Sequence, residues 1–193
     1  MGLYFSLALF AALSSNLIFQ FGLDLSSLGR AGNSTPGFFA FRAAVLFCSV
    51  MTVWIVVFYL AIPLTVVMGN VLILPLAVLT HGLYGNVLKR FLPPNDRPTD
   101  DGDTHSGNGL SLVASYLTLT LASTSAEAVV LAMGFSLGLL FSLLTIREIE
   151  KRSMLEAVPP SLRGSPLLLI SIGFLSLIFF SAAALLLGAV GFF

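Results

Sequence analysis

Charged side chains are scarce in this sequence. They make up 9% of the 193 residues, against roughly 25% in a typical soluble domain, while hydrophobic residues make up 57%. The surface of a small soluble globule must be largely polar, so such a fold could not hide this much apolar material from water. The composition therefore excludes an ordinary soluble domain and predicts an integral membrane protein.

Cysteine and the motifs of soluble enzymes are also sparse. Cys48 is the single cysteine, which excludes an intramolecular disulfide and a metal site built from cysteines of this chain alone. The sequence has no glycine-rich phosphate loop and no paired-histidine metal spacing. Basic and acidic residues balance at nine each, which leaves no net positive field for nucleic acid. We therefore expect no catalytic site within this chain and no nucleic-acid partner.

Long apolar stretches are what the sequence does contain. A membrane-spanning helix needs roughly 20 mostly apolar residues, and six such stretches follow one another at about 2–23, 38–60, 62–83, 109–123, 127–146 and 166–193. The polar stretch 91–108, rich in proline and aspartate, is predicted to be an aqueous loop, and His105 is expected to be an ordinary solvated histidine there. We predict one all-α membrane domain over 1–193, with halves at about 1–90 and 109–193.

The positions of the basic residues predict an orientation. All of them follow the first, third or fifth apolar stretch, and none follows the second or fourth; they are Arg30, Arg42, Lys89, Arg90, Arg97, Arg147, Lys151, Arg152 and Arg163. Short loops that carry Lys and Arg face the cytoplasm. Both termini are therefore predicted to lie on the opposite side.

Polar residues interrupt two of the six stretches. Ser14–Asn16 lies inside the first, and the small polar junction Ala122–Glu127 follows the fourth. Interruptions at corresponding positions of two halves are typical of inverted repeats with discontinuous helices. We therefore predict two inverted three-helix repeats with breaks in helices one and four. The alternative is that Ser and Thr bond back to the backbone of ordinary spans.

The polar side chains near these interruptions are candidates for an ion path. Asp24 and Glu127 are the acids closest to them, and they could face each other to bind a cation or relay protons. The alternative is that both acids reach water at the membrane interface. Asn16 and Gln20 lie four residues apart on one helical face, where they could line the same path or bond to a neighbouring helix.

Two further patterns concern packing and the end of the fifth stretch. Gly134 and Gly138 form a Gly-x-x-x-Gly pair, which predicts a close approach of another helix. A mixed-charge extension that continues the fifth helix into the cytoplasm is also expected, and it comprises Arg147, Glu148, Glu150, Lys151, Arg152 and Glu156. Its default interpretation is a solvated helix end, and docking of a soluble redox subunit is the alternative.

The second half of the chain carries a family resemblance. The residues that carry it are Arg147-Glu148, Val158-Pro159, Arg163-Gly164, Leu169-Ile170 and Gly173-Phe174-Leu175-Ser176-Leu177. Weaker matches are Gly134-Phe135-Ser136 and Gly138, and, in the first half, Asn16 and Phe21-Gly22-Leu23. These residues resemble the Rnf/Nqr membrane subunits of the RnfA, RnfE, NqrD and NqrE type. The resemblance implies two inverted three-helix repeats in a bacterial inner membrane. It also implies pairing with a homologous subunit inside a complex that couples electron transfer to ion pumping.

The resemblance further implies an iron–sulfur cluster, [2Fe-2S], that is shared with the partner subunit. The family's cysteine positions fall near Asp24 or Ser26 in the first repeat and near Ser125 in the second. Cys48 lies outside both motifs. Oxygen ligands are poor substitutes for thiolate on iron–sulfur iron, so we expect a divergent member that has lost the cluster. A small ion or solute transporter and an assembly scaffold remain the alternative functions.

Overall fold

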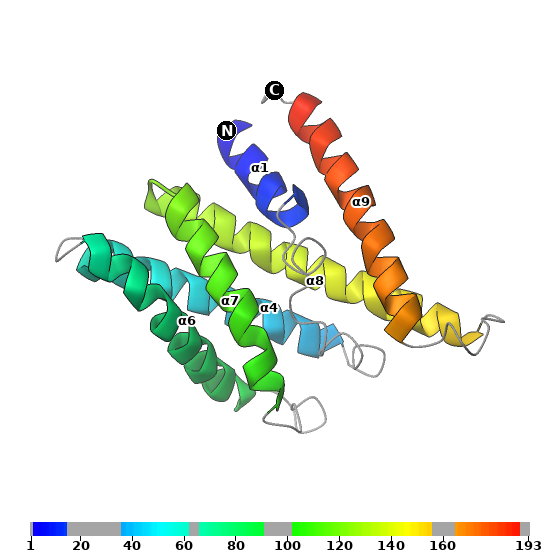
Figure 1. The fold of residues 1–193 in the computed structure, drawn as a ribbon, viewed down its shortest axis with the longest axis horizontal. Coiled ribbons are helices and arrows are strands. Elements are labelled where there is room, and N and C mark those ends of the chain that lie inside the picture. Colours follow the sequence, from blue (N-terminus) through cyan, green and yellow to red (C-terminus); the bar gives the residue numbers. More distant parts are fainter. Residues whose placement is uncertain (1, 15–35, 62–65, 91–101, 156–164, 190–193) are drawn as a thin grey trace.

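The structure, a computed structural model, describes residues 2–14, 36–61, 66–90, 102–155 and 165–189 (Figure 1). Each of these segments is helical over nearly its whole length. The helices are α1 (Gly2–Leu9), α4 (Pro36–Val56), α6 (Val66–Lys89), α7 (Gly102–Leu121), α8 (Ser125–Leu155) and α9 (Ser165–Ala189). Two short π-helical segments, Phe10–Ser14 and Val57–Ala61, continue α1 and α4.

Four of these helices are long and apolar enough to cross a membrane. The spans run over Gly37–Tyr59, Val71–Lys89, Ser125–Ser153 and Pro166–Leu185. The apolar part of α7 is shorter, at Asn108–Leu121. The described part of the chain is thus an all-helical membrane protein, as the composition predicts, and each of the six predicted apolar stretches contains a helix.

Helix ends follow the local sequence. Pro36 begins α4 and Pro166 is the second residue of α9, positions at which proline costs no backbone hydrogen bond because the first N–H groups of a helix have no partner anyway. Pro75 lies inside α6, where it removes one bond from the helix ladder. Its ring is exposed on the outer side of the bundle.

Two predicted boundaries are wrong. Helix α7 begins at Gly102, so residues 102–108 are helical and not part of the predicted loop, and His105 belongs to this helix. Helix α6 continues to Lys89 instead of ending near residue 83. The rest of the predicted loop, 91–101, lies outside the described residues.

The predicted break in the fourth helix is a turn between two helices. Helix α7 is continuous to Leu121, and the chain then leaves the helix for three residues before α8 starts at Ser125. The polar junction therefore joins α7 to α8 and does not interrupt a span. The first helix does lose regular α-geometry, at the π-helical segment Phe10–Ser14. Residues 15–35, which include the rest of the predicted first span, lie outside the described residues.

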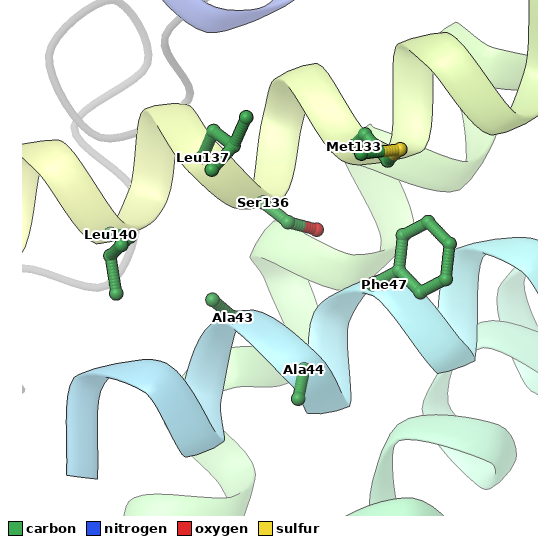
Figure 2. Close-up of a pocket in the computed structure, with 7 residues that line it drawn as sticks. All are labelled: Ala43, Ala44, Phe47, Met133, Ser136, Leu137 and Leu140. Atoms are coloured by element: carbon green, nitrogen blue, oxygen red, sulfur yellow. The ribbon is translucent and has the colours of Figure 1, made fainter. Parts of the chain in front are cut away.

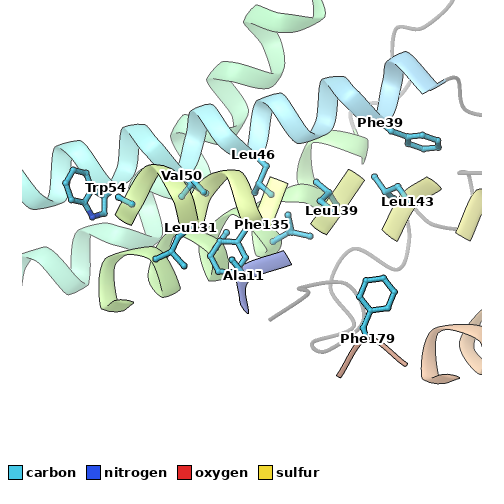
Figure 3. Packing of buried hydrophobic residues seen from close by; sticks show 14 of the residues in the cluster. Ala11, Phe39, Leu46, Val50, Trp54, Leu131, Phe135, Leu139, Leu143 and Phe179 are labelled. Atoms are coloured by element: carbon cyan, nitrogen blue, oxygen red, sulfur yellow. The ribbon is translucent and has the colours of Figure 1, made fainter. Parts of the chain in front are cut away.

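Helices α4 and α8 pack side by side at the centre of the bundle (Figure 1). Helices α6 and α7 cover one side of this pair, and α1 and α9 lie on the other. Between the two central helices, Leu46 and Val50 of α4 meet Leu131 and Phe135 of α8 in the buried core (Figure 3). Trp54 closes one end of this core, 1% exposed, with its ring stacked on Phe58 at a centroid distance of 4.7 Å.

The outer helices turn wide apolar faces away from the bundle. Only 22% of the apolar stretch of α6 and 17% of that of α9 are buried, against 56% for α8. The exposed side chains include Val71, Leu74 and Leu79 on α6, and Phe174, Leu177 and Leu185 on α9. In water such faces would drive aggregation, whereas in a bilayer they contact lipid tails.

The basic ends of the helices gather at one end of the bundle. The beginning of α4 and the end of α8 lie toward the right of Figure 1, and α6 ends at the bottom of the view. There the guanidinium of Arg147 on α8 lies over the ring of Phe39 on α4, 5.9 Å from its centroid. Arg42 lies over Phe38 in the same way, at 5.5 Å. The predicted orientation in the membrane stays a prediction, and Arg30, Arg97 and Arg163 lie outside the described residues.

Candidate functional site

The first candidate region is the crossing of α1 with α8. A Cβ atom on Gly134 would lie 2.7 Å from the Cβ of Ala11 and 2.9 Å from the carbonyl oxygen of Ala8. A Cβ on Gly138 would lie 2.7 Å from the carbonyl oxygen of Ala12. Real Cβ atoms do not approach other atoms this closely, so only glycine fits at either position. The predicted close approach at this glycine pair is confirmed, and its partner is the first helix.

This crossing coincides with the point at which the first helix becomes irregular. Ala11 is fully buried against α8 and belongs to the π-helical segment Phe10–Ser14. π-helical turns are rare overall, and those that occur are often found at functional sites. The candidate path residues Asn16, Gln20 and Asp24, together with Ser26, follow directly but lie outside the described residues. Their role in an ion path stays a prediction.

Glu127 has a local structural role at the start of α8. One of its carboxylate oxygens accepts hydrogen bonds from the backbone N–H groups of Ser123 at 2.8 Å and Thr124 at 3.3 Å. In return, the Thr124 hydroxyl accepts a bond from the backbone N–H of Glu127 at 3.3 Å. This reciprocal pair is a capping box, which satisfies N–H groups that the helix itself leaves without partners. Glu127 thus has a capping role, and its additional role in ion movement remains a prediction.

The other family positions in this region are described only in part. Ser125, at a predicted cysteine position, is the exposed first residue of α8. Cys48 lies half-buried on α4, away from that turn in sequence and on a different helix. Among the described residues, no group of three or more His, Cys, Asp or Glu side chains could hold a metal ion. The donors present at these positions do not fit an iron–sulfur cluster, which requires thiolates.

A five-residue segment of α8 matches the spacing of a hydrolase motif by chance. Residues Gly134-Phe135-Ser136-Leu137-Gly138 match the Gly-x-Ser-x-Gly spacing of a hydrolase nucleophile elbow. That motif requires a sharp turn between a strand and a helix, but here the five residues lie in the interior of α8. The hydroxyl of Ser136 donates to the carbonyl oxygen of Ala132 at 2.8 Å. The serine is therefore an ordinary helix residue.

A second candidate region lies between α4, α6 and α7, and sequence reasoning missed it. The hydroxyls of Thr52 on α4 and Tyr84 on α6 are 2.8 Å apart. Thr52 has one proton, which it donates to the carbonyl oxygen of Cys48 at 2.8 Å. Tyr84 is therefore the donor between the two hydroxyls.

A parallel pair joins α4 to α7. The hydroxyl oxygens of Ser49 and Ser111 are both buried and lie 3.0 Å apart. Ser49 donates its proton to the carbonyl oxygen of Leu46 at 3.0 Å, so Ser111 donates to Ser49. Both pairs point in one direction, with α6 and α7 donating to α4.

Three further polar side chains stand one helical turn from these pairs. His81 precedes Tyr84 by three residues on α6, while Asn108 and Ser115 flank Ser111 on α7. His81 Nδ1, Asn108 Oδ1 and Ser115 Oγ are buried without a hydrogen-bond partner among the described residues. We call the seven residues Ser49, Thr52, His81, Tyr84, Asn108, Ser111 and Ser115 the three-helix polar cluster.

His81 gives this cluster its chemical interest. It lies within the apolar span Val71–Lys89, where an ionisable side chain is costly and usually marks a functional position. In the sequence His81 and Tyr84 stand three residues apart in an apolar stretch, but nothing there indicates which helices they face. A protonatable ring one helical turn from Tyr84 could bind a small polar ligand or accept a proton.

Comparison of the sequence with models of protein families finds no match, and comparison with curated proteins also finds none.

Proposed function

We propose that this chain is a membrane subunit of an ion-translocating electron-transport complex of the Rnf/Nqr kind, in which it pairs with a homologous membrane subunit. Under this proposal the two halves, 1–90 and 109–193, are inverted three-helix repeats. The basic end of the bundle faces the cytoplasm of a bacterial inner membrane, and both termini lie on the other side. The motif resemblance and the one-sided charges support this reading.

The single observation that carries the proposal is the irregular first helix packed against the centre of α8. Backbone that departs from α-helix at membrane depth is tolerated only where it is buried in protein or lines a cavity. Ala11 meets this condition, because it is fully buried against Gly134. Discontinuous helices surround the ion sites of inverted-repeat transporters, and under this proposal the π-helical segment marks the start of such a break. The polar residues Asn16 and Gln20 follow this segment in the sequence.

In this proposal the chain provides a membrane path and does not itself hold the cluster. Oxygen donors stand at the positions near Asp24, Ser26 and Ser125 where the family has cysteines. The subunit would then contribute helix packing and polar lining, while electron carriage belongs to other subunits. Iron analysis of the purified complex and of the purified chain separates these contributions.

The test is to purify the tagged chain from its native membranes in mild detergent and identify its companions by mass spectrometry. Membranes that hold the untagged chain serve as the control. Recovery of homologous membrane subunits together with flavin or iron–sulfur proteins supports the proposal. Recovery of the chain alone, or only with itself, refutes it. Companions whose assembly, but not activity, depends on this chain would instead indicate a scaffold.

The three-helix polar cluster favours a second candidate, a small ion or solute transporter without redox chemistry. Here the purified chain alone would move its substrate across liposome membranes. Replacing His81 by Gln, which keeps the size and polarity but removes the titratable ring, should abolish that transport. Tyr84→Phe serves as the matched change of a hydroxyl in the same cluster. Transport that is unaltered by both changes would exclude this path.

A further inference from the structure

An apolar groove runs along the outer side of the interface between α4 and α8. Ala43, Ala44 and Phe47 line it from α4, and Met133, Ser136, Leu137 and Leu140 line it from α8, as Figure 2 shows. Its volume is about 320 Å³, at the lower end of the range for small-ligand sites. The groove exists because alanine and serine face each other where larger side chains would fill the space.

The groove is open to the surroundings of the bundle. Ala44 is exposed, and Met133 and Leu137 are 50% and 57% exposed. All its lining residues lie within the membrane spans Gly37–Tyr59 and Ser125–Ser153. The molecules that reach it from outside are therefore those of the bilayer, and its apolar walls suit a hydrocarbon chain.

The α8 side of the groove continues into two positive charges. Met133, Leu137 and Leu140 occupy one stripe of the helix, and the same spacing of three and four residues leads through residue 144 to Arg147 and Lys151. Arg147 lies seven residues beyond Leu140, or about 10 Å along the helix axis. It stands over Phe39, near the beginning of α4 and four residues before Ala43.

Two acids, Glu148 and Glu150, lie beside this stripe on the same helix. Glu148 is the acid next to Arg147, and its carboxylate accepts a bond from Arg152 at 3.0 Å on the adjoining face of the helix. The stripe from Met133 to Lys151 itself contains no acidic residue. The apolar groove lies within the membrane, and the two cations lie beyond it along the helix. A phospholipid has the same order, because its acyl chains lie in the membrane and its phosphate lies at the surface.

We propose that this groove is a binding site for an anionic membrane phospholipid. One acyl chain lies between α4 and α8, and the phosphate of the headgroup binds Arg147 and Lys151. Basic pockets between membrane helices bind anionic headgroups in this manner. Phosphatidylglycerol is the probe we choose, because it carries one net negative charge and two acyl chains.

The test is native mass spectrometry of the full chain in a non-denaturing detergent, with dioleoyl-phosphatidylglycerol or dioleoyl-phosphatidylcholine added. We expect the anionic lipid to be retained about tenfold better than the zwitterionic lipid with the same chains. The double variant Arg147→Gln/Lys151→Gln should lose this preference. Its control, Lys89→Gln/Arg90→Gln, removes the same charge from the end of α6 and should keep it.

A second variant tests the groove separately from the charges. Ala44→Leu places a larger side chain in the groove and should lower retention of phosphatidylglycerol severalfold. Ala184→Leu makes the same change on the exposed face of α9 and should have no effect. Equal retention of both lipids by the native chain would overturn the proposal. So would equal losses in the two charge variants, or full retention by Ala44→Leu.

Discussion

The crossing of α1 over α8 makes a quantitative prediction about two glycines. In Gly138→Ala the new Cβ would meet three backbone atoms of Ala12, the oxygen at 2.7 Å, Cα at 3.1 Å and the carbonyl carbon at 3.3 Å. Backbone atoms cannot rotate away as a side chain can, so α1 must move. Overpacking of this kind costs about 1–3 kcal/mol of unfolding free energy.

The matched control is Gly173→Ala on α9. No atom lies within 4 Å of a Cβ at Gly173, so that change gains only the helix preference of alanine, about 1 kcal/mol. Gly138→Ala gains the same preference. The difference between the two variants therefore isolates the cost of the contact. We expect the unfolding free energy of Gly138→Ala to fall about 1–3 kcal/mol below that of Gly173→Ala.

The assay is unfolding in mixed micelles by increasing sodium dodecyl sulfate, followed by tryptophan fluorescence. Trp54 is the single tryptophan of the chain and is buried in the core, so its emission reports loss of packing. Equal stabilities of Gly138→Ala and Gly173→Ala would refute the close approach of α1 and α8.

A double-mutant cycle adds a sharper criterion. At Gly134 the nearest atom is the Cβ of Ala11, a side-chain atom that Ala11→Gly removes. Ala11→Gly should therefore partly rescue Gly134→Ala, with a favourable coupling energy on the order of 1 kcal/mol. At Gly138 the contacts are all with backbone, so Ala12→Gly should not rescue Gly138→Ala. Identical coupling in both cycles would contradict the geometry.

Two further predictions concern the role of Glu127 and the direction of a hydrogen bond in the three-helix polar cluster. In Glu127→Gln the capping box survives, because glutamine also accepts the backbone N–H bonds, so stability should be kept, whereas Glu127→Ala should lose about 0.5–2 kcal/mol in the same unfolding assay. If Glu127 also conducts cations, Glu127→Gln alone should abolish cation-dependent activity in proteoliposomes, and unchanged activity would exclude that role. In the three-helix polar cluster, Thr52→Val leaves the half-buried Tyr84 hydroxyl without its acceptor and should cost about 1–3 kcal/mol. Tyr84→Phe leaves Thr52 bonded to Cys48 and should cost about 0.5–1.5 kcal/mol. The reverse order of the two costs would show that Thr52 and not Tyr84 is the donor.

The membrane class and the positions of the helices could be predicted from the sequence because both depend on local composition. An apolar stretch of sufficient length predicts a membrane span wherever it occurs. The glycine pair at 134 and 138 predicted a close approach of another helix. The N-terminal boundary of α7 was not predicted. A polar stretch rich in aspartate is as typical of a loop as of the first turns of a helix.

The sites were harder to predict than the spans. Glu127 drew attention as an acid near a membrane helix, but its cap depends on three backbone groups whose positions only the turn between α7 and α8 fixes. The polar cluster is invisible in sequence because its hydroxyl pairs, Thr52 with Tyr84 and Ser49 with Ser111, join residues 32 and 62 positions apart. Only the packing of α4 against α6 and α7 brings them together.

The lightly packed α9 has a consequence for how the protein is made. With 17% of its apolar stretch buried, this helix owes its place in the membrane to its own sequence and little to its neighbours. It can enter the bilayer as an independent span after the other helices have assembled, and dock afterwards through a few contacts such as Phe179 on Phe141. Among the described helices, α9 is therefore the one that we expect to separate from the bundle first.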